Sequence, residues 1–284
     1  MAIITISRGV QSGGRKLAHS LAEKLGYQCL AREVVSMCAK RYNIPEEDLY
    51  ERLIEAPSRW LGPSKEHFRY PLYIQCTLIN VAKQDNVIYH GYAGQLFLRG
   101  VTHTLRVRLE APYRDRVEAE MREHNKSRED AEKYIERGDA LRQRWIKLLY
   151  DEDWHDPALY DLSINLKTMS IESACDMMAL LAERPEFQKT DESMRRLDEL
   201  SLACEVKAAI ASDDTLWKHL WEQSIIVLAS GSVITLRGTV KNKEVGAAMQ
   251  DVASKVKGVS ECRFEATPLG DVLSHRPEYG AGHD

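Results

Sequence analysis

The sequence has no excess of positive charge and no long apolar run. Its 39 Lys and Arg residues are outnumbered by 43 Asp and Glu residues, which gives a formal net charge of −4. General nucleic-acid binders are usually basic, so no nucleic-acid partner is expected. No stretch reaches the roughly 20 apolar residues of a transmembrane helix, so no membrane-spanning segment is expected.

The sequence also lacks paired cysteines, because its six cysteines lie far apart and none forms a CxxC motif. Cysteine metal ligands commonly occur in such pairs, so the sequence predicts no metal site. Scattered thiols are typical of the reducing cytoplasm. The N-terminal residues Met-Ala-Ile-Ile-Thr-Ile-Ser resemble a strand rather than the basic leader of an export signal. We therefore expect a cytoplasmic protein.

The length of 284 residues suits two domains. Residues 186–198 are polar and charged, and this composition predicts a linker. It would separate a first domain over 1–185 from a smaller domain over 199–268. Residues 269–284 are rich in Gly, Pro and His, which predicts a loose tail.

The first domain alternates strand patterns with helix patterns. An apolar run over 3–6 is followed by a glycine-rich loop and then by a helix in which Leu17, Leu21 and Leu25 share one face. Further strands are predicted at 86–90, 104–109 and 159–166, and further helices at 32–42, 45–55, 66–84, 127–149 and 171–181. This alternation predicts an α/β fold with a mostly parallel sheet covered by helices on both faces.

The glycine-rich loop reads Gly9-Val-Gln-Ser-Gly-Gly-Arg-Lys16. Against the P-loop template, Gly9 and Gly14 take the two glycine positions and Arg15 stands where lysine is usual. Backbone N–H groups of such a loop bind phosphate. The predicted phosphate-binding residues are Gly9, Ser12, Gly13, Gly14, Arg15 and Lys16. A glycine-rich turn without a ligand fits the motif equally well, but the position between strand and helix favours phosphate.

The run from Ile3 to Ala18 resembles the opening of the cytidylate-kinase-like family, a branch of the P-loop nucleoside monophosphate kinases. The resemblance continues through Asn86-Val-Ile-Tyr-His-Gly, Leu109-Glu-Ala-Pro-Tyr-Arg, Ile135-Glu-Arg-Gly-Asp-Ala-Leu-Arg and Trp154-His-Asp-Pro-Ala-Leu-Tyr-Asp-Leu-Ser-Ile-Asn. It implies a P-loop kinase-type fold and an ATP-dependent transfer of phosphate to a nucleoside monophosphate, CMP or dCMP. Mg²⁺ would be held mainly by phosphates and water.

A charged helical segment supplies the predicted lid. Together with Arg15, its residues Arg137, Asp139, Arg142 and Arg144 are the predicted catalytic residues, since arginines can neutralise charge on a moving phosphoryl group. The resemblance places Asp139 and Arg142 on the family's Asp-x-x-Arg lid pattern. Helical spacing puts Arg137 and Arg144 on one face and points Arg142 elsewhere unless the helix bends. The alternative is a solvated face with intrahelical ion pairs. Arg114 and Arg116 are weaker candidates.

The acceptor side departs from the family. An acidic-basic pair usually follows the family's second strand, and here the residues are Ala31 and Arg32. Gly-Arg often follows the third strand, and here the residues are Gly91 and Tyr92. We predict that Arg32 holds the acceptor phosphate and that Tyr92 stacks on a base or packs. The departures leave open a nucleotide-binding sensor without turnover, or a kinase for another small metabolite.

The C-terminal part resembles a BON domain, a small α/β sandwich. The resemblance rests on the alternating strand Ile234-Thr-Leu-Arg-Gly-Thr-Val240 and on the closing pair Gly258-Val259. That family is often tied to binding lipid or protein. We expect a non-catalytic regulatory or binding module here, whose partner is a protein, a lipid or a second copy of the chain.

Overall fold

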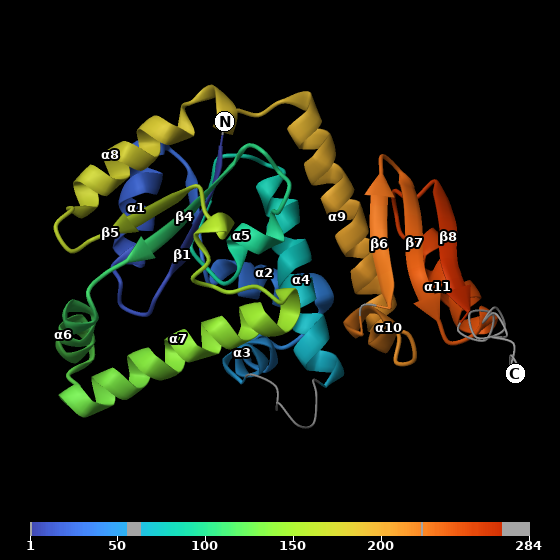
Figure 1. Ribbon diagram of the computed structural model, residues 1–284, viewed down its shortest axis with the longest axis horizontal. Coiled ribbons are helices and arrows are strands. Elements are labelled where there is room, and N and C mark those ends of the chain that lie inside the picture. The colour runs from blue at the N-terminus through green and yellow to red at the C-terminus, as the bar shows by residue number, and fades with distance from the viewer. Residues whose placement is uncertain (1, 56–63, 223, 269–284) are drawn as a thin grey trace, which may run out of the picture. The chain divides into compact units, whose positions relative to one another are not determined.

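The computed structural model describes residues 2–55, 64–222 and 224–268 (Figure 1). The predicted loose tail, residues 269–284, lies outside this range. The chain divides into two compact units. The first comprises Tyr73–Leu197 and the residues before 63, and the second comprises residues 63–72 and those from Asp198 onward.

The first unit contains a parallel sheet of five strands in the order β2-β3-β1-β4-β5. The strands are β1 (Ile3–Arg8), β2 (Gln28–Leu30), β3 (Val87–Tyr89), β4 (Thr104–Glu110) and β5 (Leu162–Asn165). In chain order, the helices from β1 to the one that follows β5 are α1 (Gly14–Leu25), α2 (Glu33–Tyr42), α3 (Glu46–Ile54), α4 (Lys65–Ala82), α5 (Gly94–Phe97), α6 (Tyr113–His124), α7 (Arg128–Tyr150) and α8 (Ile171–Ala182). The predicted α/β fold with a parallel sheet is confirmed.

Helices cover both faces of the sheet, and β1 is buried on both sides. Ile4 and Ile6 belong to a buried cluster with Leu17 of α1 and residues of α8, and Figure 1 shows these two helices on the same face. Thr5 points to the other face, where α5 approaches so closely that a Cβ on Gly94 would lie 3.2 Å from its Cγ2. Burying one such Leu or Ile side chain contributes about 1.5–3 kcal/mol.

The segment before β5 differs from the predicted strand over 159–166. Residues Pro157–Leu159 form a short 3₁₀ helix, and β5 begins only at Leu162. The side chain of Asp156 accepts a hydrogen bond from the Ala158 N–H at 2.8 Å, and the following proline already has a helical φ. The cap therefore turns the chain before the strand starts.

Part of the predicted linker is helical. Helix α9 (Asp191–Ser212) begins inside residues 186–198. Thr190 and Ser193 cap it reciprocally, because each accepts a hydrogen bond from the other's backbone N–H, at 3.1 and 2.9 Å. Asp191 and Glu192 then favour the first turn electrostatically. The charged composition that suggests a linker thus belongs to a capped helix start, and the domain boundaries at 185 and 199 stay a prediction.

The second unit has a mixed sheet of three strands in the order β6-β7-β8, in which β6 pairs antiparallel and β8 parallel to β7. Its elements are α10 (Trp217–Trp221), β6 (Ile225–Ser230), β7 (Val233–Val240), α11 (Lys243–Ser254) and β8 (Glu261–Pro268). A hairpin turn joins β6 and β7 at Gly231, which has a positive φ of 56°. Ile234, Leu236 and Met249 are fully buried and form part of its core.

We predict that Gly238→Ala destabilises the second unit far more than Gly231→Ala. Gly238 has φ 138°, and a Cβ there would collide with the backbone carbonyl of Ser224. Gly231 also has a positive φ but faces open space. The expected losses in the free energy of unfolding are more than about 2 kcal/mol and about 1 kcal/mol, respectively. Urea unfolding followed by circular dichroism measures both, and equal losses would contradict the close approach.

Candidate functional site

The chain leaves β1 through a tight loop, residues 9–13, that leads directly into α1. Gln11 and Gly13 adopt left-handed backbone conformations, with φ of 56° and 80°. The buried Ser12 hydroxyl donates to the Gly9 carbonyl at 2.9 Å and braces the turn from inside. The loop therefore stands at the carboxyl end of a central parallel strand and at the N-terminus of a helix, where anions bind.

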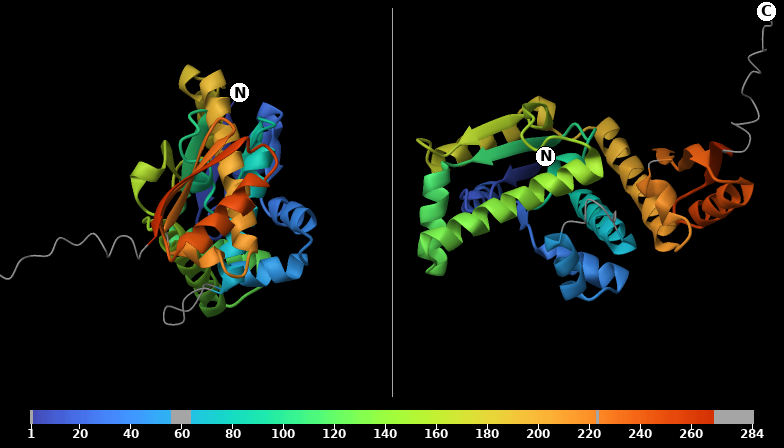
Figure 2. Two further views of the ribbon diagram at one scale, coloured as in Figure 1. Left: turned by 90° about the vertical axis from the view of Figure 1, so that its right-hand side faces the viewer. Right: turned by 60° about the horizontal axis from the view of Figure 1, so that its bottom comes forward.

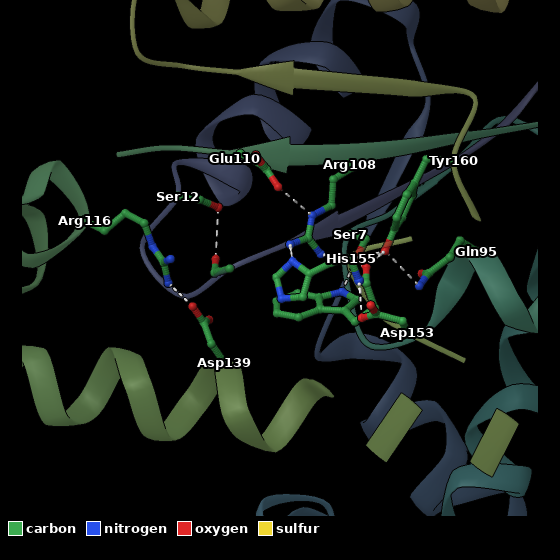
Figure 3. Close-up of polar contacts among 12 residues, drawn as sticks. Ser7, Ser12, Gln95, Arg108, Glu110, Arg116, Asp139, Asp153, His155 and Tyr160 are labelled. Carbon is green, nitrogen blue, oxygen red and sulfur yellow. Dashed lines mark hydrogen bonds and ion pairs between the residues drawn. The ribbon is translucent and has the colours of Figure 1, made fainter. Parts of the chain in front are cut away.

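One backbone amide of this loop already donates a hydrogen bond to a carboxylate. The Val10 N–H donates to the Asp139 carboxylate at 2.8 Å. Arg116 donates to the Val10 carbonyl at 2.7 Å and is ion-paired with the same carboxylate (Figure 3). Because a carboxylate and a phosphate both offer anionic oxygens, Asp139 stands where an oxyanion would lie. The loop thus presents at least one N–H outward to an anion.

Helix α7 is held against the loop by apolar contact as well. Figure 2 shows α6 leading from the end of β4 into this long helix. Val10, Val117, Ala131 and Ile135 form a small buried cluster, and Gly138 lies so close to the Val10 side chain that a Cβ would not fit. The face of α7 that carries Gly138 and Asp139 is therefore fixed toward the loop.

Two arginine side chains lie across the two glycines that the P-loop template requires. A Cβ on Gly9 would come within 2.9 Å of the Arg116 guanidinium carbon, and one on Gly14 would collide with the Arg8 side chain. Glycine at these positions lets cationic side chains approach the loop backbone. Glycine is therefore needed at positions 9 and 14 because any larger residue there would displace Arg116 or Arg8.

Arg8, the last residue of β1, is a site residue that the sequence reasoning missed. Its guanidinium donates to His90 Nδ1 at 3.2 Å, and its buried Nε has no hydrogen-bond partner in the described part of the chain. Burial and the nearby charge of Arg142 lower the pKa of Arg8 to about 10. Burial, with Arg8 beside it, lowers the pKa of His90 to about 4, so this ring is neutral at pH 7. In the sequence, the run Ile6-Ser-Arg8 is the signal from which Arg8 could have been identified as a site residue.

The predicted lid residues divide between two faces of α7. Asp139 and Arg142 point inward, and their charged groups are 3.4 Å apart. Arg137 and Arg144 are exposed. Arg142 thus lies on a different face of α7 from Arg137 and Arg144, and the packing of Gly138 on Val10 turns the 139/142 face toward the loop.

The predicted donor-side and acceptor-side residues lie in different surroundings. Arg15 and Lys16 are exposed in the first turn of α1. Tyr92 is close to the lid, since the guanidinium carbon of Arg142 lies 5.4 Å from its ring centre. Arg32 instead stacks on Tyr50 at 4.7 Å, with its side chain 67% exposed. Tyr92 therefore lies near Arg8 and Arg142, whereas Arg32 contacts Tyr50.

A buried polar network, also missed from the sequence, supports the opposite face of β1. Arg108 of β4 pairs in register with Ser7, and its guanidinium lies 4.0 Å from the Trp154 ring centre and 3.2 Å from His155 Nδ1. Trp154 in turn donates to the Ser7 hydroxyl at 2.8 Å. Figure 3 shows this group beside the loop. It anchors the segment before β5 to the strand that carries the loop.

Together, the parallel sheet and the loop between β1 and α1 define a fold of the P-loop kinase type. The comparison with known families agrees, since residues 3–168 match the model of the cytidylate kinase-like family. This match covers more than half of the chain, and the chain belongs to that family. A comparison with curated proteins gives no match.

Three solved structures show the level of structural similarity. An uncharacterised protein from Eubacterium ventriosum ATCC 27560 is 17% identical with a TM-score of 0.49, over 65% of this chain and 100% of that chain. A shikimate kinase from Acinetobacter baumannii is 14% identical with a TM-score of 0.40, over 64% and 92%. A sugar kinase from Janibacter sp. HTCC2649 is 10% identical with a TM-score of 0.41, over 67% and 99%.

Within the described residues, no helix is long and apolar enough to cross a membrane.

We predict that Asp139→Asn strengthens the binding of inorganic tripolyphosphate about three- to tenfold. An incoming polyanion must displace the Asp139 carboxylate from Val10, and the neutral amide gives up this hydrogen bond and its hold on Arg116 more readily. Calorimetric titration gives the affinities. Glu136→Gln is the matched control, because Glu136 is an exposed α7 carboxylate that accepts from Tyr113 instead. An equal gain in the control, or no gain in Asp139→Asn, would contradict this role.

Proposed function

We propose that this chain is an ATP-dependent phosphotransferase whose acceptor is a nucleoside monophosphate, CMP or dCMP by its family resemblance, and that it acts in the cytoplasm. The proposal rests chiefly on the loop that offers the Val10 N–H to an anionic oxygen. Three arginines, Arg8, Arg116 and Arg142, surround that loop. Family membership supports the same reaction class.

On the donor side, the loop amides would hold the phosphates of ATP in the place that Asp139 takes. Displacement of this carboxylate would leave Arg116 and Arg142 without their anionic partner and free them to pair with phosphate oxygens. Arg15 lies in the first turn of α1 and would balance further charge. Because the Ser12 hydroxyl is already bonded to Gly9, Mg²⁺ would be held mainly by phosphates and water.

On the acceptor side, Arg8, Arg142 and Tyr92 would face the incoming monophosphate. The γ-phosphoryl group of ATP would pass to an acceptor phosphate oxygen and yield ADP and a nucleoside diphosphate. Negative charge spreads over the equatorial oxygens in that transition state, and guanidinium groups stabilise it electrostatically. Tyr92 offers a ring for stacking, while the exposed Arg32 would act only at the rim.

We predict that purified protein with ATP and Mg²⁺ converts CMP or dCMP to the diphosphate. Arg15→Ala and Arg142→Ala should each lower kcat/KM at least tenfold, about 1.4 kcal/mol, because each removes a cation from the phosphate region. Arg122→Ala is the control, since Arg122 is exposed on α6. Release of ADP measures turnover. A panel of nucleoside monophosphates without any turnover would contradict the proposal.

A second candidate function is a nucleotide sensor without turnover. The observation that favours it is the Asp139 carboxylate, which accepts the hydrogen bond of the Val10 N–H and so competes with a phosphate for it. The departures from the family at Ala31 and Tyr92 point the same way. The BON-like second unit would then bind a protein partner, a lipid or a second copy of the chain.

We predict that, for a sensor, ATP raises the Tm while no monophosphate is converted. A ligand that prefers the folded state stabilises it in proportion to its occupancy. Thermal unfolding with and without ATP, run beside the ADP assay, separates the two functions. Product formation excludes the sensor, and an unchanged Tm at millimolar ATP contradicts both functions.

A further inference from the structure

Three ligand-type side chains from distant parts of the sequence meet on one face of the sheet. His19 of α1, Cys29 of β2 and His90 after β3 place one ligand atom each within 4.8 Å of one another. Cys29 pairs in register with Ile88, and His90 lies two residues further along. Because side chains alternate along a strand, Cys29 and His90 project from the same face, the one that α1 covers.

We infer that His19, Cys29 and His90 form a binding site for a zinc-type divalent metal ion. Imidazole nitrogen and thiolate sulfur are the ligands that zinc takes, and three protein ligands leave its fourth position to water or another molecule. His19 is exposed and Cys29 is half-buried, so an ion can reach the site from solvent. On binding, the Cys29 thiol releases its proton to solvent and forms the sulfur–metal bond.

A negative charge lies beside the three ligands. The Glu33 carboxylate interacts electrostatically with Cys29, His19 and His90. It is held in place because it accepts the Ala31 N–H at 2.7 Å. Glu33 thus offsets part of the positive charge that a divalent ion brings close to Arg8.

Arg8 and the metal ion exclude one another at His90. The guanidinium can only donate, so His90 Nδ1 accepts from Arg8 and Nε2 carries the ring proton. A metal at Nδ1 replaces this hydrogen bond directly. A metal at Nε2 moves the proton to Nδ1, which then cannot accept from Arg8. In either geometry, metal binding separates Arg8 from His90.

The test titrates the full chain with Zn²⁺ alone by calorimetry and with Co²⁺ by absorption. The wild-type protein should bind one Zn²⁺, and Co²⁺ should give a sulfur-to-metal charge-transfer band. Cys29→Ser should abolish the band, and both Cys29→Ser and His19→Ala should weaken Zn²⁺ binding at least tenfold. These two positions are chosen because His90 is buried and its replacement can impair folding. Circular dichroism checks that each variant is folded.

Two controls separate this site from incidental binding. Cys262→Ser changes a half-buried free thiol of the second unit, and His124→Ala changes a histidine at the end of α6. Neither should alter the affinity by more than twofold. A wild-type protein without the charge-transfer band, a band that survives in Cys29→Ser, or an equal loss in the controls would overturn the site. Arg8→Met should strengthen Zn²⁺ binding severalfold, and an unchanged affinity would overturn the competition for His90.

Discussion

The parallel pairing of β1 with β3 and β4 is the constraint on which the rest of the molecule depends. It brings the carboxyl ends of three strands to one edge, so that the loop after Arg8, the segment after Tyr89 and the end of β4 lie side by side. Each strand then delivers a polar side chain to that edge, such as His90 beside Arg8. Ser7 meets Arg108 on the opposite face in the same way. Without this pairing neither network would exist.

The concentration of positive charge at this edge carries an energetic penalty that an anion relieves. Burial disfavours the charge of Arg8, and the nearby charge of Arg142 adds to the effect. In the structure, the Asp139 carboxylate provides the compensating charge for Arg116 and Arg142. Among the described residues, Arg8 has no ion-pair partner that the structure shows, and it donates to neutral His90. Its side chain lies both at Gly14 of the loop and at the proposed metal site.

Local sequence patterns predict the structure correctly where residues close in the sequence determine it. The apolar run of β1, the glycines of the loop and the leucines of α1 predict strand, turn and helix, and each forms there. Composition and residue spacing do not decide the structure where capping or packing does. The charged stretch after residue 186 contains the start of a capped helix. Likewise, seven-residue spacing grouped Arg137 with Arg144, whereas the contact of Gly138 with Val10 selects Asp139 and Arg142.

The sequence by itself determined the α/β fold class, the glycine loop between strand and helix, and the family to which the chain belongs. These properties follow from periodicity and short motifs, which act over a few residues. Only the tertiary structure decided which arginines gather around the loop and that His19, Cys29 and His90 meet. The physical reason is that strand register and helix rotation are set by packing between segments far apart in the sequence, such as those of Val10 and Asp139, which are 129 residues apart. No local spacing encodes those distances.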